Sequence, residues 1–209
     1  MVAAGEESWR TAGFAVAAGT VEVGSVRIRL AGEDPPGGLL SWSLRGLASA
    51  ELDGLPTWSS ERPPAQGGTH PNGVVAIDHV VVFSPDLDRT TTALRAAGLD
   101  FRRLREEPTP AGAPRQAFFR LGELILEVIQ APDGSHLVAE AGPARLWGIS
   151  FLVNDLDAAA AVLGELLSEP RAAVQPGRLI ATARREAELG LPVAFMTRGP
   201  PQRGEGQGQ

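Results

Sequence analysis

A histidine and a carboxylate that could do chemistry together lie in two of the most apolar runs of the chain. His79 lies within GVVAIDHVVVFS (73–84) and Glu127 within ELILEVIQA (123–131). Both runs are rich in β-branched or aliphatic residues, which predicts mostly buried strands. If these strands are neighbours, the carboxylate could ligate a divalent metal together with the imidazole, or orient and polarise it. Strand alternation predicts the residues that share their faces: Ile77 and Val81 with His79, and Ile125 and Ile129 with Glu127.

The composition excludes several catalytic and binding classes. The chain has no Cys, Tyr or Lys, so that all 19 basic residues are Arg. This excludes a thiolate nucleophile, a Schiff-base lysine, a tyrosine acid and a Walker phosphate loop, and no GxSxG elbow is present. A net charge of −6 argues against nucleic acid and anionic membranes as partners. No apolar run is long enough to span a bilayer and no secretory signal begins the chain, which predicts a cytoplasmic protein.

An internal repeat runs through the second two thirds of the sequence. The segment IDHVVVFSPDLDRTTTALRAAG (77–98) is similar to WGISFLVNDLDAAAAVLGEL (147–166). Likewise, LGELILEVIQAP (121–132) is similar to LGLPVAFMTRGP (189–200). The similarity recurs in the same order, which indicates two copies of one structural unit.

The second copy does not keep the histidine or the carboxylate. Alignment of the two Asp-Leu-Asp turns places Gly148 opposite His79, and alignment of the two Leu-Gly starts places Phe195 opposite Glu127. We therefore expect the Phe195 ring to occupy the place of the second carboxylate.

Each copy predicts a strand, a helix and three further strands, with the helices at 86–97 and 155–166 on the outer face of a sheet. The predicted fold is α+β: two tandem βαβββ modules forming cupped sheets with outer helices, plus an N-terminal β extension. The expected division of the chain is a disordered N-terminus at 1–12, the β extension (a possible degenerate module) at 13–56, a linker at 57–73, module 1 at 74–132, a linker at 133–144, module 2 at 145–200 and a disordered tail at 201–209.

The strand IDHVVV, the helix start PDLDRT, the strand pair PRQAFFRLGELILEV and the repetition itself resemble the vicinal oxygen chelate superfamily over residues 74–200. This superfamily groups glyoxalases, bleomycin-resistance proteins and extradiol dioxygenases. The resemblance implies a cavity between paired modules, with a metal held by side chains of first and last strands. It implies His79 and Glu127 as ligands of zinc, iron, manganese or nickel. Two ligands make an incomplete site, so we expect no resident cofactor, although a two-fold homodimer could supply the pair twice.

Further candidates for binding a ligand lie on the predicted cup. Arg115 could clamp a substrate carboxylate, with a surface salt bridge as the alternative. In the second copy, the positions matching the lining of the first are Ser150, Leu152, Val193, Phe195 and Thr197, which suit either a small-molecule pocket or a collapsed core. His70 and His136 lie in polar or Gly/Pro-rich loops, and we expect both to be solvated.

These observations predict a glyoxalase-like protein that binds a small organic molecule in the cup between modules without a complete metal site. The alternative is a metal-dependent lyase, isomerase or dioxygenase that uses His79 and Glu127. A structural or interaction module with a filled cavity is a third class, and neither the substrate nor the reaction follows from the sequence.

Overall fold

One eight-stranded sheet organises the chain, with the strand order β12-β13-β14-β11-β7-β10-β9-β8. The computed structural model describes residues 1–33, 37–108, 112, 115–132, 134, 139 and 141–199. In its first half, the elements are β7 (Val74–Ser84), α2 (Leu87–Ala96), β8 (Asp100–Arg105), β9 (Gln116–Leu121) and β10 (Leu124–Gln130). In its second half, they are β11 (Arg145–Val153), α3 (Asp157–Leu163), the short 3-10 helix η1 (Gly164–Leu166), β12 (Arg171–Ala172), β13 (Leu179–Thr182), the 3-10 helix η2 (Arg185–Ala187) and β14 (Val193–Thr197).

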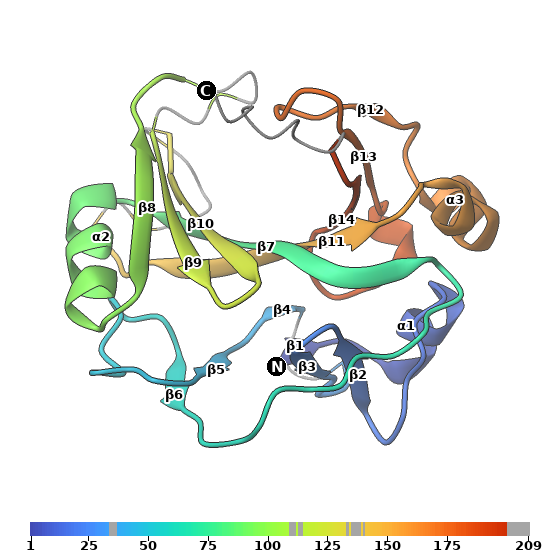
Figure 1. Ribbon diagram of the computed structural model, residues 1–209, viewed down its shortest axis with the longest axis horizontal. Helices are drawn as coiled ribbons and strands as arrows, with labels where there is room; N and C mark the ends of the chain where they lie inside the picture. Colours follow the sequence, from blue (N-terminus) through green and yellow to red (C-terminus); the bar gives the residue numbers. More distant parts are fainter. Residues whose placement is uncertain are drawn as a thin grey trace, which may run out of the picture.

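The sheet bends into a U-shaped cup. The long strands β7 and β11 pair antiparallel at its centre, β10 runs parallel to β7, and β14 runs parallel to β11. Figure 1 shows β8, β9 and β10 as one wall and β12, β13 and β14 as the other, with α2 and α3 on the outer sides. Both predicted helices are therefore present and lie outside the cup.

Local sequence explains where α2 begins and ends. The Asp86 carboxylate accepts a hydrogen bond of 2.9 Å from the backbone N–H of Arg89, which caps the first turn. Gly98 follows the helix with a φ of +90°, a conformation that glycine adopts without strain. The apolar face of α2 packs on β9 and β10 through a core that includes Leu87, Leu94, Phe119 and Leu126.

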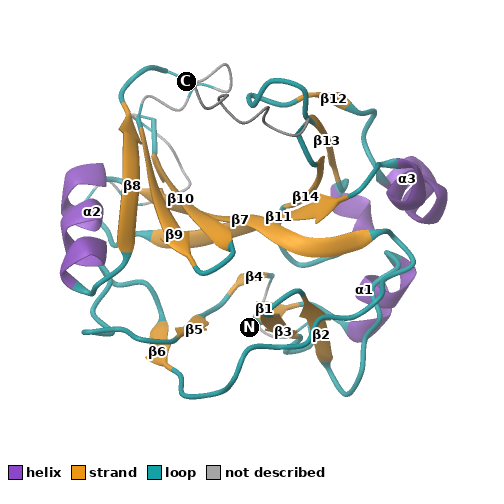
Figure 2. Ribbon diagram, viewed as in Figure 1, coloured by secondary structure: helices purple, strands orange, loops and turns teal. Residues whose placement is uncertain are grey.

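The N-terminal segment covers the outer side of the cup floor (Figure 2). Its elements are β1 (Val2–Ala3), α1 (Glu6–Thr11), β2 (Thr20–Val23), β3 (Val26–Arg29), β4 (Gly38–Leu39), β5 (Trp42–Leu44) and β6 (Thr57–Ser59). The expectation of a disordered N-terminus at 1–12 is wrong, because the Trp9 ring is fully buried against Phe14 and Phe151. The expected disordered tail at 201–209 lies outside the described residues. None of the helices in the described ranges is long and apolar enough to cross a bilayer.

Candidate functional site

A β-bulge in the floor of the cup places two consecutive side chains on the same face. Ser150 of β11 pairs with His79, but the next residue, Phe151, pairs with Ile77, so that Asp78 is skipped. An extra residue of this kind interrupts the alternation of faces. Ile77 therefore lies in the core with Val80 rather than beside His79, which corrects the prediction that Ile77 shares the histidine's face.

The bulge allows Asp78 to hold His79 from the side. The Asp78 carboxylate accepts hydrogen bonds from His79 Nδ1, at 2.8 Å, and from Arg178 Nη2, at 2.5 Å. Arg178 is itself fixed, because its Nε donates to the Thr197 carbonyl at 2.7 Å. Burial alone would raise the pKa of Asp78, but the hydrogen bonds from His79 and Arg178 outweigh it and hold that pKa below its ordinary value.

This chain of side chains fixes the histidine tautomer. A carboxylate only accepts, so Nδ1 carries a proton, and in the neutral ring Nε2 presents its lone pair to the cup. Among the described residues, Nε2 has no hydrogen-bond partner, since the nearest carboxylate oxygen, Glu127 Oε2, is 3.6 Å away. Both side chains are only 16% exposed. The imidazole is therefore oriented by the protein, and its reactive nitrogen is left without a partner.

Glu127 lies on the neighbouring strand, β10, and faces the same cavity. Its carboxylate accepts a hydrogen bond from the amide Nε2 of Gln116 on β9. Burial raises the pKa of Glu127, with Asp78 adding to the effect and His79, Arg103 and Arg105 opposing it. The Gln116 Oε1 atom is buried without a hydrogen-bond partner in the described structure. The partly buried Ile125 and Ile129 lie on the same face as Glu127, as predicted. The residues between them, Leu126 and Val128, lie in the core on the other side.

A pocket lies on the other side of His79, against the second half of the chain. Strand pairing places four side chains in one row across the floor: His79, Ser150, Ala194 and Thr182. All four line a pocket of about 140 Å³, together with Val81, Trp147 and Gly148 among others. The Ser150 hydroxyl is buried and lacks a hydrogen-bond partner in the described structure. Such orphaned polar groups are uncommon in native structures.

The expected place of Phe195 in the cup is wrong. Its ring is fully buried on the opposite face of the sheet, where it contacts Phe14 and Phe151. The Leu-Gly alignment is out of step with the strands by one residue, and a shift of one residue moves a side chain to the other face. Val193 lines the pocket, as predicted, although its side chain is also buried in this core. Ala194 pairs with Ser150 as Ile125 pairs with His79. Met196, two residues after Ala194, therefore corresponds to Glu127, two residues after Ile125.

Gly148 does not occupy a position where a histidine could fit. A Cβ atom there would lie 2.7 Å from the Pro192 carbonyl oxygen, closer than real Cβ contacts allow. The backbone of β11 needs glycine at this point to pack against Pro192. Strand pairing matches Ser150 with His79 and Met196 with Glu127, so the second half offers a hydroxyl and an apolar methionine at the corresponding positions.

The remaining candidates lie outside the pocket. Arg115 forms ion pairs with Asp88 of α2, at 3.0 Å, and with Glu106, which makes it the surface salt-bridge residue of the alternative interpretation. The Thr197 hydroxyl accepts a hydrogen bond from the Leu179 backbone and supports the β13–β14 pair. His136 lies outside the described residues.

His70, expected to be solvated, is instead buried, with 4% exposed. Its Nδ1 accepts from the Ala15 backbone N–H at 3.1 Å, and its Nε2 contacts the Glu22 carbonyl at 3.1 Å. Burial lowers the pKa of His70, although the hydrogen bond to Glu22 opposes the shift. This histidine fastens the expected linker to the N-terminal hairpin and has no link to the pocket.

Sequence reasoning missed Asp78 and Arg178, which orient His79. Asp78 precedes the histidine directly, and strict alternation places consecutive strand residues on opposite faces. Arg178 lies 100 residues away in sequence. The IDH triplet was the available signal for Asp78, while no local pattern pointed to Arg178.

A resident catalytic metal, as the fold type implies, does not fit the described side chains. Catalytic sites use about three or more protein ligands, and the described residues contain no cluster of three His, Asp or Glu side chains that could hold an ion. His79 and Glu127 supply two ligands, and Glu127 is already paired with Gln116.

The fold and the site define an α+β protein with a cupped sheet and an imidazole–carboxylate pair at its floor. Residues 76–170 match the Glyoxalase/Bleomycin resistance protein/Dioxygenase superfamily. This match confirms the predicted resemblance to the vicinal oxygen chelate superfamily over residues 76–170.

Solved structures agree on the fold. Methylmalonyl-CoA epimerase from Mycobacterium tuberculosis matches with a TM-score of 0.50 and 18% identity, over 62% of this chain and 91% of that chain. The enzyme of the same name from Streptomyces coelicolor, solved in complex with 2-nitronate-propionyl-CoA, matches with a TM-score of 0.49 and 24% identity, over 61% of this chain and 99% of that chain. A comparison with curated proteins gives no match. At 18% identity, the likeness to the Mycobacterium tuberculosis enzyme shows the fold alone.

Proposed function

We propose that this protein binds a small organic molecule in the cup, beside His79 and Glu127, without a resident catalytic metal. The observation that carries the proposal is the chain Arg178–Asp78–His79, which fixes an imidazole that lines the pocket, with its Nε2 on the side of Glu127 and without a hydrogen-bond partner among the described residues. A histidine that only filled space would need neither a bulge nor two ionic partners to hold its orientation.

The size of the pocket limits the ligand. A volume of about 140 Å³ is close to the ~150 Å³ of an engineered cavity that accepts benzene. The part of the ligand that enters this pocket should therefore have about six non-hydrogen atoms. We also propose that the two halves of the cup are copies of one βαβββ module, of which the second supplies a wall of the pocket rather than a second polar centre.

A pocket-filling variant tests this proposal. Ala194→Leu adds three carbon atoms beside Ser150, while Ala172→Leu makes the same change at an exposed position of β12. In a protein-observed NMR screen of organic acids, amides and alcohols with up to about ten non-hydrogen atoms, we expect hits that shift the His79 ring resonances. These hits should be lost in Ala194→Leu and kept in Ala172→Leu. Hits that persist in Ala194→Leu would show that the binding is elsewhere.

The second candidate function is a metal-dependent lyase, isomerase or dioxygenase. It is favoured by one observation, since metal-binding histidines commonly donate their second ring N–H to a carboxylate, as His79 does to Asp78. Metal analysis of protein purified without chelators decides between the two. We expect substoichiometric zinc, iron, manganese and nickel. A stoichiometric metal that disappears in His79→Ala would make the enzyme the better reading.

A further inference from the structure

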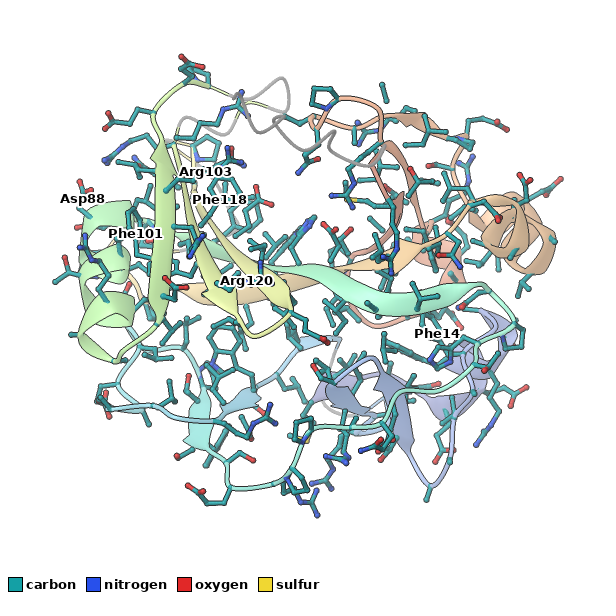
Figure 3. The ribbon with its side chains drawn as sticks, viewed as in Figure 1. Phe14, Asp88, Phe101, Arg103, Phe118 and Arg120 are labelled. Atoms are coloured by element: carbon teal, nitrogen blue, oxygen red, sulfur yellow. The ribbon has the colours of Figure 1, made fainter. Side chains whose placement is uncertain are left out.

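The inner face of the β8–β9–β10 wall carries guanidinium groups next to the acidic centre. The guanidinium of Arg103 lies over the Phe118 ring, with its central carbon 4.5 Å from the ring centroid. Strand pairing sets Phe118 beside Glu127, and Arg105 beside Gln116. Figure 3 shows Arg103 and Phe118 together on the inner side of this wall, while Asp88 and Phe101 lie toward α2.

Neither Arg103 nor Arg105 has a carboxylate of its own among the described residues. The ion pairs of this wall use other arginines: Arg102 pairs with Asp100 at 3.2 Å, and Arg115 pairs with Asp88 and Glu106. The charges of both guanidinium groups lower the pKa of Glu127, although neither group forms an ion pair with it within the described structure. Two cations on a concave face are therefore left with unused hydrogen-bond donors.

A buried acceptor lies beside these cations. The Gln116 side chain is 6% exposed, its NH₂ group is committed to Glu127, and its Oε1 atom has no partner in the described structure. An amide oxygen can only accept, so its missing partner is an N–H or O–H group. Leaving such a group unpaired is unfavourable, and a ligand that donates to it would recover that loss.

We infer that the ligand of the cup is an organic oxyanion whose charged group binds Arg103 and Arg105 and whose adjacent hydroxyl or amide N–H donates to Gln116. This inference rests on the proposed function, because it names the class of molecule that the cup receives. Guanidinium groups present paired donors that match the oxygens of carboxylates and phosphates. Phe118 holds one such group in place before the ligand arrives.

The strand spacing sets the length of the ligand. The Arg103 guanidinium lies above β9, two strands from His79 on β7. At the usual spacing of strands, this separates it from the imidazole by on the order of 10 Å. A six-atom group beside His79, joined by a few atoms to an oxyanion, spans that distance.

Three probes with a common ring test the inference on the full-length protein by NMR titration: 3-phenyllactate, its neutral amide 3-phenyllactamide, and 2-phenylethyl phosphate. We expect at least one anion to bind at least about tenfold more tightly than the amide, as expected for hydrogen bonds between charged groups. The preferred anion tells a carboxylate from a phosphate. Arg103→Gln and Arg105→Gln should each remove most of that advantage, while Arg102→Gln, on the same strand but paired with Asp100, should keep it.

The outcomes separate this inference from the proposed function. Equal binding of all three probes in the cup, or an equal loss in Arg102→Gln and Arg103→Gln, would overturn the anion site and leave small-molecule binding standing. Failure of every probe to shift the His79 resonances would overturn the inference together with its premise. The urea unfolding midpoint is measured for the three arginine variants. An unchanged midpoint shows that a loss of binding does not come from a loss of folding.

Discussion

The Arg178–Asp78 ion pair should couple the two halves of the cup far more strongly than an exposed pair of the same chemistry. Asp78 and Arg178 are 18% and 15% exposed, and their closest atoms are 2.5 Å apart. In the Asp88–Arg115 pair, at 3.0 Å, the aspartate is 74% exposed. Because charge-assisted hydrogen bonds out of water contribute about 1.5–3 kcal/mol, we expect a coupling near the middle of that range for the first pair. The exposed pair should give at most about 0.5 kcal/mol.

Two double-mutant cycles measure these energies. Each uses alanine at both positions, singly and together, and urea unfolding at neutral pH gives the free energy of unfolding for every variant. The single variant Asp78→Ala should be the most costly, because it leaves the Arg178 guanidinium without its counter-ion. The pKa of folded Asp78 lies below its ordinary value of 3.8. The coupling should therefore stay constant down to that pH and decline as the pH falls further, through the folded-state pKa.

An independent measurement follows the function of the pair rather than its energy. Nitrogen-15 NMR of the His79 ring reports which nitrogen carries the proton. The wild-type ring should be the Nδ1–H tautomer, and Asp78→Ala should mix the two tautomers while Asp88→Ala leaves them unchanged. Equal coupling energies in the two cycles, or a His79 tautomer indifferent to Asp78, would refute the reasoning that the bulge exists to orient the imidazole.

Two further predictions concern pH. Because burial lowers the pKa of His70 below 6.5, its unfolded form binds the proton first, so the free energy of unfolding should fall as the pH drops below about 6.5 toward the folded-state pKa. Urea unfolding from pH 7.5 to 5 checks this, and His70→Gln should flatten the profile in that window. The raised pKa of Glu127 predicts that anions bind the cup more tightly as the pH falls through it, since the protonated carboxyl no longer repels them. Titration of 3-phenyllactate between pH 7 and 4 tests this. The Glu127→Gln variant, with Asp78, His79, Arg103 and Arg105 unchanged, should remove the pH dependence of the affinity.

Much of the scaffold was predictable because hydrophobic periodicity and turn residues are local signals. The apolar runs around His79 and Glu127 form the adjacent strands β7 and β10, and the Asp-Leu-Asp turns precede both outer helices. Alternation also placed Ile125 and Ile129 correctly, since β10 pairs with β7 without interruption. Where the backbone is regular, counting residues by two gives the right face.

The site itself depends on irregular or distant features that such counting cannot supply. The bulge at Asp78 appears only in the pairing of β7 with β11, and it reverses the face of Ile77. The second-half error has the same origin, because an alignment anchored on Leu-Gly ignores the residue at which β14 begins. His70 was missed for a different reason: its partners, Ala15 and Glu22, come from the N-terminal hairpin, whose contact with the linker is purely tertiary.

The two halves of the cup, proposed above to be copies of one module, contribute different parts of the site. Gly148 cannot accept a side chain, so the second half has no room to regain a histidine there. Yet the same half supplies the guanidinium that fixes Asp78, and Ser150 and Thr182 of the pocket wall. Asp78, which orients the histidine, is itself held by Arg178, a residue 100 positions later in the chain. A structure that had merely decayed would not need this dependence, whereas a pocket shaped for one ligand requires that one half hold the polar centre and the other position it.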